Sequence, residues 1–286
     1  SISIGYQAGA FTQLQNAIAI GYQSGFNSQS PETVAIGYQA GMTFQATGSI
    51  SVGYQSGLAN QNVQAVAVGY QAGQTNQGKQ SIAIGYLSGA NNQGSGSIAI
   101  GYQSGQISQG TGSIAIRYQS ANNYQGIQSV AIGYQAGYSN QSLQSVSIGY
   151  QAGMTNQALQ SVAIGAQAGN VSQSSNSIAI GYQAGMTLQG FQAVAIGYQS
   201  GYSQQATGSI SIGYQAGMTN QNMNAIAIGY QAGALSQGPG SISIGYRSGM
   251  TNQISNSIVI SGGTDGLTGA SQGFFVNPVR FDNSNT

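Results

Sequence analysis

The chain has 286 residues, of which only 4 are basic and 3 are acidic, and it contains neither histidine nor cysteine. So few charges cannot form a basic surface for phosphates, so we expect no nucleic-acid binding. Catalysis and most metal sites need clustered His, Cys, Asp, Glu or Lys side chains, which are missing or scattered here. The composition therefore predicts a protein that is not an enzyme and holds no cofactor or metal ion, and with no apolar run near the roughly 20 residues of a membrane span we expect no membrane insertion.

A sixteen-residue phrase fills residues 1–260 without insertion or deletion. One copy reads SIAIGYQAGMTLQGFQ (177–192), and the glycine after the apolar run recurs at every sixteenth position from Gly5 to Gly245, except at Arg117. A short fixed period is typical of a solenoid in which each copy forms one coil. The sequence thus predicts a repeat region over 1–260 and a C-terminal non-repeat segment over 261–286.

Each copy opens with an alternation of β-branched and small residues, as in Ile98, Ala99 and Ile100. This pattern predicts a short strand, and the frequent glycines exclude a helix. Stacked copies then form an all-β, parallel β-solenoid. We expect the Ile/Val rows to form a continuous aliphatic column inside it, and the small residues between them to offer a packing surface to a second sheet or another chain.

The next stretch, G-Y-Q-[AS]-G, predicts a tight turn, because two glycines supply positive φ angles. In one copy Arg117 and Ala121 replace both glycines, which predicts a bulge or an altered turn there. The tyrosines either form a stripe that stacks on sugar rings or on a receptor, or cover the edge of the coil. The stripe candidates are Tyr22, Tyr38, Tyr54, Tyr70, Tyr86 and Tyr102.

Four residues after the second glycine, a glutamine stands in all sixteen copies. Such constancy predicts a structural ladder in which amides hydrogen-bond from coil to coil, or bonds that satisfy carbonyl groups of the turns. The first six are Gln13, Gln29, Gln45, Gln61, Gln77 and Gln93. The remaining positions vary, and we expect them on the solvent side.

The strand phrase resembles the head repeat of the YadA-like trimeric autotransporter adhesins over residues 1 to about 260. Residues that carry the resemblance are Ser97, Ile98, Ala99, Ile100, Gly101 and Ser104. It implies a left-handed parallel β-roll that assembles as a homotrimer, with small residues and part of the aliphatic rows between chains. The chain departs from the family in its longer period and its uniform Tyr-Gln pair.

The C-terminal stretch GFFVNPVR (273–280) resembles the segment that precedes an endosialidase-type intramolecular chaperone in phage and giant-virus fibre proteins. This resemblance implies a virion or phage fibre rather than a bacterial adhesin. The match is about eight residues long.

Together these features predict an extracellular structural fibre or adhesin rod of a virion, phage tail or cell surface. Its partners are other copies of itself and a host-surface glycan or protein receptor. A self-assembling extracellular filament is the alternative. A third hypothesis, an ice-binding solenoid, requires a regular threonine array, and threonine stands at the relevant position in only six coils, at 43, 75, 155, 187, 219 and 251.

Overall fold

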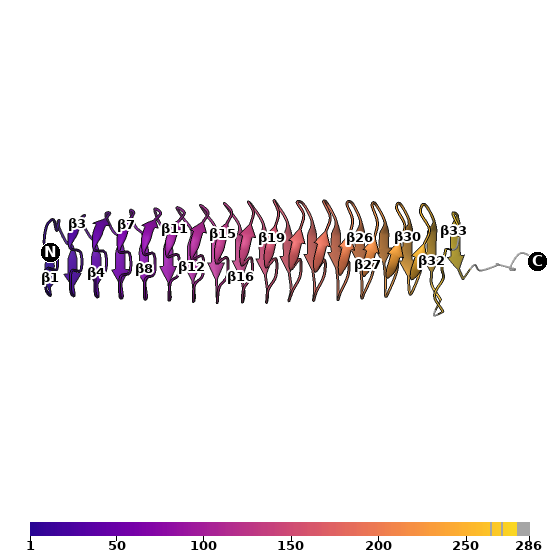
Figure 1. The fold of residues 1–286 in the computed structure, drawn as a ribbon, viewed down its shortest axis with the longest axis horizontal. Helices are drawn as coiled ribbons and strands as arrows, with labels where there is room; N and C mark the ends of the chain where they lie inside the picture. The colour runs from indigo at the N-terminus through magenta and orange to yellow at the C-terminus, as the bar shows by residue number, and fades with distance from the viewer. Residues whose placement is uncertain (264, 270, 279–286) are drawn as a thin grey trace, which may run out of the picture. The chain divides into compact units, whose positions relative to one another are not determined.

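The computed structural model describes residues 1–263, 265–269 and 271–278, and these residues form 33 short strands and no helix. The fold is an all-β parallel β-solenoid of about 17 turns with a repeat of about 16 residues, so the predicted fold class is confirmed. Two compact units make up the chain, Ser1–Asn156 and Gln157–Thr286. Within each unit the coils follow one another in chain order (Figure 1).

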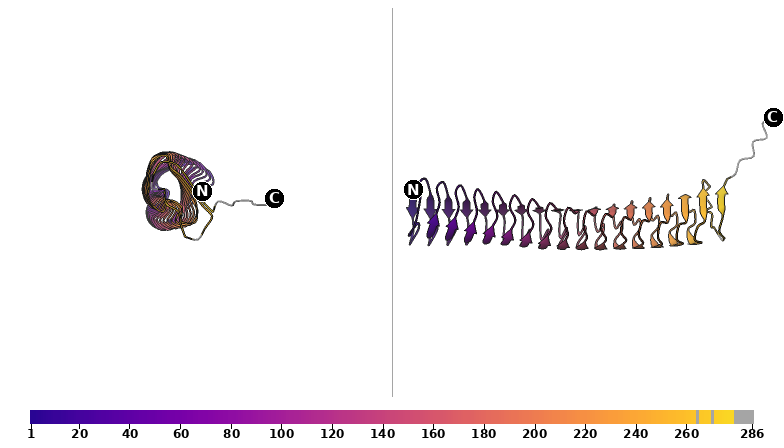
Figure 2. Two further views of the ribbon diagram at one scale, coloured as in Figure 1. Left: turned by 90° about the vertical axis from the view of Figure 1, so that its right-hand side faces the viewer. Right: turned by 90° about the horizontal axis from the view of Figure 1, so that it is seen from above.

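The first unit contains two parallel sheets, which Figure 2 shows as two rows of strands. The strands of its first sheet are β1 (Ile2–Ile4), β2 (Ile18–Ile20), β4 (Val34–Ile36), β6 (Ile50–Val52), β8 (Val66–Val68), β10 (Ile82–Ile84), β12 (Ile98–Ile100), β14 (Ile114–Ile116), β16 (Val130–Ile132) and β18 (Val146–Ile148). Its second sheet contains β3 (Asn27–Gln29), β5 (Thr43–Gln45), β7 (Ala59–Gln61), β9 (Thr75–Gln77), β11 (Asn91–Gln93), β13 (Ile107–Gln109), β15 (Asn123–Gln125) and β17 (Ser139–Gln141).

The second unit repeats this arrangement. Its first sheet contains β20 (Val162–Ile164), β22 (Ile178–Ile180), β24 (Val194–Ile196), β26 (Ile210–Ile212), β28 (Ile226–Ile228), β30 (Ile242–Gly245), β32 (Ile258–Ser261) and β33 (Phe274–Asn277). Its second sheet contains β21 (Val171–Gln173), β23 (Thr187–Gln189), β25 (Ser203–Gln205), β27 (Thr219–Gln221), β29 (Leu235–Gln237) and β31 (Thr251–Gln253), and β19 (Thr155–Gln157) falls on the boundary between the units.

Every strand pair shares one register, in which a residue lies beside the residue sixteen positions further along. Ile82 pairs with Ile98 in this way, and Gln93 pairs with Gln109. The spacing persists beyond the sequence repeat, because Phe274 in β33 pairs with Ile258 in β32. One further strand of the solenoid therefore lies in the C-terminal segment, while Val279 and Arg280 of the GFFVNPVR motif lie outside the described residues.

The interior of each coil is small and polar, and the expected aliphatic column inside is wrong. The middle residue of the first-sheet strands from β2 to β32, such as Ala99, is fully buried, whereas Ile100 beside it is 36% exposed. The largest fully buried side chains are almost all glutamines of the second sheet. Each coil is a narrow loop of only sixteen residues, so small side chains and amide groups fill most of the interior. The Ile/Val rows point outward, and Val259 is the one branched aliphatic residue inside among the described residues.

Glycine is strongly favoured at the turn after the first-sheet strands. At Gly69, for example, φ is +132°, and an added Cβ would lie 2.4 Å from the carbonyl oxygen of Gly85 in the next coil. Both the backbone angle and the close approach of the coils therefore disfavour an L-residue at this position.

The coil that contains Arg117 keeps the regular turn, so the expected bulge is wrong. Arg117 adopts a φ of 104° and Ala121 a φ of 45°. The strands on both sides keep their register, and the ring of Tyr118 stacks on both neighbouring tyrosines at centroid distances of 5.0 Å. Pairing with the adjacent coils therefore holds this turn in a backbone conformation that arginine disfavours.

Candidate functional site

The outward Ile/Val residues of the first sheet form two rows along each unit, and we call these rows the aliphatic face. In the first unit Ile84 and Ile100 are 39% and 36% exposed, and in the second unit Ile180 and Ile244 are both 37% exposed. The same exposure recurs coil after coil because the register places Ile or Val above Ile or Val. A soluble single chain rarely leaves so regular an apolar surface uncovered, so this face is a candidate surface for self-association.

The tyrosines that follow the first-sheet strands stack in a continuous ladder within each unit. In the first unit the ladder runs from Tyr6 to Tyr150, with neighbouring ring centroids 4.9–5.3 Å apart and planes within 14° of parallel. In the second unit it runs from Tyr182 to Tyr246.

All six predicted stripe tyrosines belong to the first ladder and are about two-fifths exposed. Because each ring has a neighbour on both faces, the ladder presents ring edges and hydroxyl groups to a partner. The binding role of this stripe stays a prediction, and a sugar ring cannot stack on an inner tyrosine unless the ladder opens.

A ladder of glutamine amides, which the sequence reasoning missed, runs beside the tyrosines. It is distinct from the predicted ladder of interior glutamines. The glutamine after each tyrosine has a φ near 50° and donates through Nε2 to Oε1 of its equivalent in the preceding coil, as Gln39 does to Gln23 at 2.9 Å. Leu87 interrupts the ladder in the first unit, and in the second unit Arg247 donates to Gln231 at its end. The uniform Tyr-Gln pair was the available signal for it.

The glutamines that end the second-sheet strands point into the coil, where most are almost fully buried. Gln29 donates to Gln45 at 2.9 Å, Gln45 donates to Gln61 at 3.0 Å, and Gln61 donates to Gln77 at 3.2 Å. Their Nε2 atoms also bond to backbone carbonyls, as Gln61 does to Ile50 at 2.7 Å. Amide-to-amide and amide-to-carbonyl bonds therefore occur together in one coil.

Two of the predicted ladder residues lie outside this chain of amides. Gln13 accepts from the hydroxyl of Ser3 and donates to the carbonyl groups of Ile2 and Ala17. Gln93 donates to the carbonyl of Ile82 at 2.7 Å, but its Oε1 has no hydrogen-bond partner among the residues that the structure describes. Both residues thus bind backbone carbonyls of the first sheet.

In the part of the chain that the structure describes, no group of three or more His, Cys, Asp or Glu residues could hold a metal ion. The described residues also include no helix with the length and apolar character needed to cross a membrane.

Residues 77–104, in the first unit, and residues 222–248, in the second, match the YadA head domain repeat. These two segments are similar to adhesin head repeats. The two matched segments cover about a fifth of the 286 residues, and each contains one complete coil with parts of the coils before and after it. No curated protein matches the chain. The resemblance of residues 273–280 to chaperone-bearing fibre proteins stays a prediction.

Proposed function

We propose that this chain is a non-enzymatic, structural part of an extracellular adhesin fibre, which assembles as a homotrimer through its aliphatic faces and acts in attachment. The observation that carries the proposal is the outward aliphatic face, repeated on every coil of each unit. The match to the YadA head repeat supports an adhesin-like fibre, because heads of that type form homotrimers on a cell surface.

The size of the aliphatic face favours association over many coils. Full burial of an isoleucine side chain contributes about 1.5–3 kcal/mol, so covering one that is 36% exposed, such as Ile100, contributes about 0.5–1 kcal/mol. Association costs roughly 4–15 kcal/mol in lost translational and rotational freedom. One coil cannot offset this, whereas the ten first-sheet strands of the first unit together reach it. Repetition is thus what makes the contact stable.

An attachment role fits a surface on which very few groups titrate. With 4 basic and 3 acidic residues, contacts to a host depend little on salt or on charge. Repetition along the chain and across three chains would convert weak contacts into avidity for a host-surface glycan or protein receptor. A virion fibre and a cell-surface appendage are both compatible with this role, and we propose no nucleic-acid, membrane-inserting or cofactor-dependent activity.

The solution mass of the full chain tests the proposal. We expect one species of three times 29.0 kDa across a wide range of protein concentrations. The triple variant I84T/I100T/I116T keeps β-branched residues on the strands but lowers their hydrophobicity, so it should dissociate at concentrations at which the parent stays trimeric.

The matched control is V63T/I127T/L143T, which changes three exposed aliphatic residues outside the aliphatic face, in a turn where Thr47 and Thr111 stand naturally. This control should remain trimeric. A parent with the mass of a single chain would refute the proposal, and open-ended growth with concentration would favour the filament.

A further inference from the structure

The middle residues of the second-sheet strands form an outward row, which we call the outer row. Their φ angles lie between 48° and 63°, in the left-handed region. Asparagine and serine occupy most of these positions, which suits the backbone because short polar side chains tolerate this conformation best. The sequence reasoning treated these positions as unconstrained solvent-facing residues.

Asparagines of the outer row are joined by hydrogen bonds that all point the same way. Asn60 donates through Nδ2 to Oδ1 of Asn76 at 2.9 Å, and Asn76 donates likewise to Asn92 at 2.9 Å. Further along the first unit Asn140 donates to Asn156 at 3.2 Å. The amide oxygen of each accepting asparagine therefore faces the preceding coil.

Two aromatic residues interrupt the outer row of the first unit. Phe44 has a φ of 53° and is 61% exposed, and Tyr124 has a φ of 55° and is 60% exposed. A bulky side chain is strained at such an angle and gains little from burial here, so neither residue is explained by stability. Neither ring stacks on another ring within the described residues, unlike the rings of the tyrosine ladder.

Both aromatic residues stand in the same local setting. A serine precedes each one in the outer row and an asparagine follows it, giving Ser28, Phe44 and Asn60 at one site. The second site contains Ser108, Tyr124 and Asn140. The two sites are eighty residues apart, which is five coils of the first unit and roughly 24 Å at a strand spacing of about 4.8 Å.

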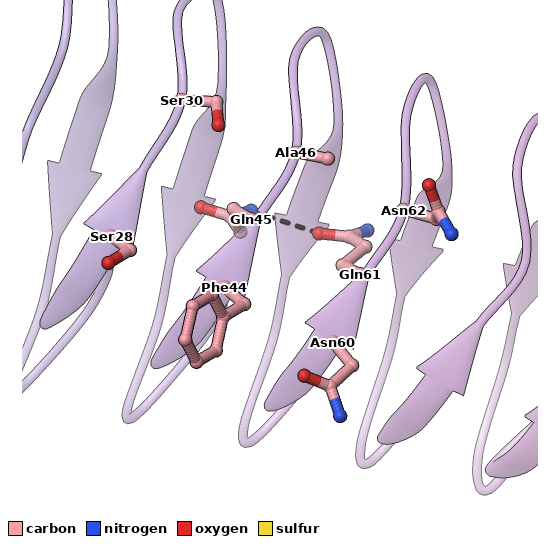
Figure 3. Close-up of a pocket in the computed structure, with 8 residues that line it drawn as sticks. All are labelled: Ser28, Ser30, Phe44, Gln45, Ala46, Asn60, Gln61 and Asn62. Atoms are coloured by element: carbon pink, nitrogen blue, oxygen red, sulfur yellow. Dashed lines mark hydrogen bonds between the residues drawn. The ribbon is translucent and has the colours of Figure 1, made fainter.

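A shallow groove borders each aromatic ring. The first is lined by Ser28, Ser30, Phe44, Ala46, Asn60 and Asn62 together with the strand ends Gln45 and Gln61. Figure 3 shows the ring of Phe44 beside Asn60, whose amide oxygen faces the ring while its nitrogen points away. That oxygen accepts no hydrogen bond among the described residues, since Phe44 has no donor to offer it.

The groove at Tyr124 has an equivalent lining of Ser108, Gly126, Asn140 and Ser142 with Gln125 and Gln141. Asn140 again donates its amide nitrogen onward, which leaves its oxygen on the side of the aromatic ring. Each groove thus combines an exposed aromatic ring, an oriented acceptor and hydroxyl groups. Neither groove is lined by a charged side chain.

The geometry points to a pair of subsites for a neutral saccharide, at Phe44 and at Tyr124. The apolar face of a pyranose ring covers an aromatic ring, while its hydroxyl groups donate to the open Oδ1 of Asn60 or Asn140. An anionic sugar would call for a basic residue, and none lines either groove. This inference rests on the attachment role proposed above and names the ligand class for it.

The test uses the full chain on an array of neutral, sialylated and sulfated glycans, with F44N/Y124N as the variant. Asparagine continues the outer-row ladder and relieves the strain, so the variant should melt at a higher temperature than the parent while its binding falls about tenfold for each subsite removed. The control F191N removes an exposed aromatic residue of the second unit that lies outside the outer row.

We expect the parent and F191N to bind neutral glycans and F44N/Y124N to lose them. Equal binding by F44N/Y124N, binding of charged glycans only, or binding of no glycan would overturn the inference. The solution mass separates this result from the proposed function. A trimer that binds no neutral glycan refutes the saccharide subsites alone, whereas a single-chain mass refutes the trimeric fibre whatever the array shows.

Discussion

Replacing Gln61 by leucine removes one of the most highly connected side chains of the interior. Gln61 is 1% exposed. Its Oε1 accepts from the Ser51 hydroxyl at 2.6 Å and from Gln45 at 3.0 Å. Its Nε2 lies 2.7 Å from the carbonyl oxygen of Ile50, with the Ala65 carbonyl oxygen and Gln77 Oε1 each at 3.2 Å. Leucine has a similar volume and can make none of these bonds.

The expected loss follows from these contacts. Two hydrogens and two lone pairs of Gln61 are used, and four neutral hydrogen bonds at about 1 kcal/mol each amount to about 4 kcal/mol. Burial of the leucine side chain offsets about 1.5–3 kcal/mol of this. We therefore expect Q61L to lower the free energy of unfolding by about 1–3 kcal/mol.

Thermal unfolding followed by far-UV circular dichroism measures the effect, with Q74L as the matched control. Gln74 is half-buried, and Leu58 occupies the equivalent position one coil earlier. Q74L should change the free energy of unfolding by no more than about 0.5 kcal/mol. If Q61L were as stable as the parent or more stable, the interior would favour apolar side chains and the reasoning would be refuted.

Three further substitutions or conditions test the turns and the surface. G69A brings a Cβ to 2.4 Å from the Gly85 carbonyl oxygen and should lower the free energy of unfolding by roughly 2–5 kcal/mol. In the control G96A the added Cβ meets nothing within 4 Å, so the loss should be about 1 kcal/mol. Equal losses in the two variants would contradict the close approach of the coils. R117G relieves a φ of 104° and should raise stability by about 1–2 kcal/mol in the same unfolding assay, and a loss would show that arginine is not strained there. Adding sodium chloride should move the melting temperature by only about 1 °C, because so few charges are present, and a large shift would reveal an electrostatic contribution absent from this account.

The sequence was sufficient for the architecture because every constrained position repeats in step. Ile98, Gly101 and Gln109 recur at sixteen-residue intervals, and only a stack of identical coils gives each of them the same surroundings. A period of sixteen also leaves room for just two short strands and their turns in each coil.

The alternation of Ile98, Ala99 and Ile100 could not predict which face of the strand points into the coil. A period of two defines two faces but does not say which one points inward. Hydrophobicity alone favours the isoleucines inside, but small residues and glutamines fill the narrow coil, and a chain that self-associates can bury the isoleucines against other copies. The width of the coil is a property of the closed structure and is not encoded in any single copy.

The left-handed positions of the outer row were missed although the sequence carried a signal for them. Asn60, Asn76 and Asn92 share one position of the repeat, and asparagine is the side chain that most readily accepts a positive φ apart from glycine. With that constraint recognised, Phe44 and Tyr124 would have stood out as exceptions. Their neighbours across the groove come from adjacent coils, so only the structure could show that these rings are exposed and unstacked.

Chemical crosslinking between chains tests the central claim most directly, because the chain has no cysteine and each single variant carries one thiol. The account places Ile100 on the face that packs against other copies and Ala99 inside its own coil. With a short bismaleimide crosslinker, I100C should therefore yield covalently linked chains, and A99C should yield none. Linked chains from A99C and single chains from I100C would reverse the two faces and contradict the account.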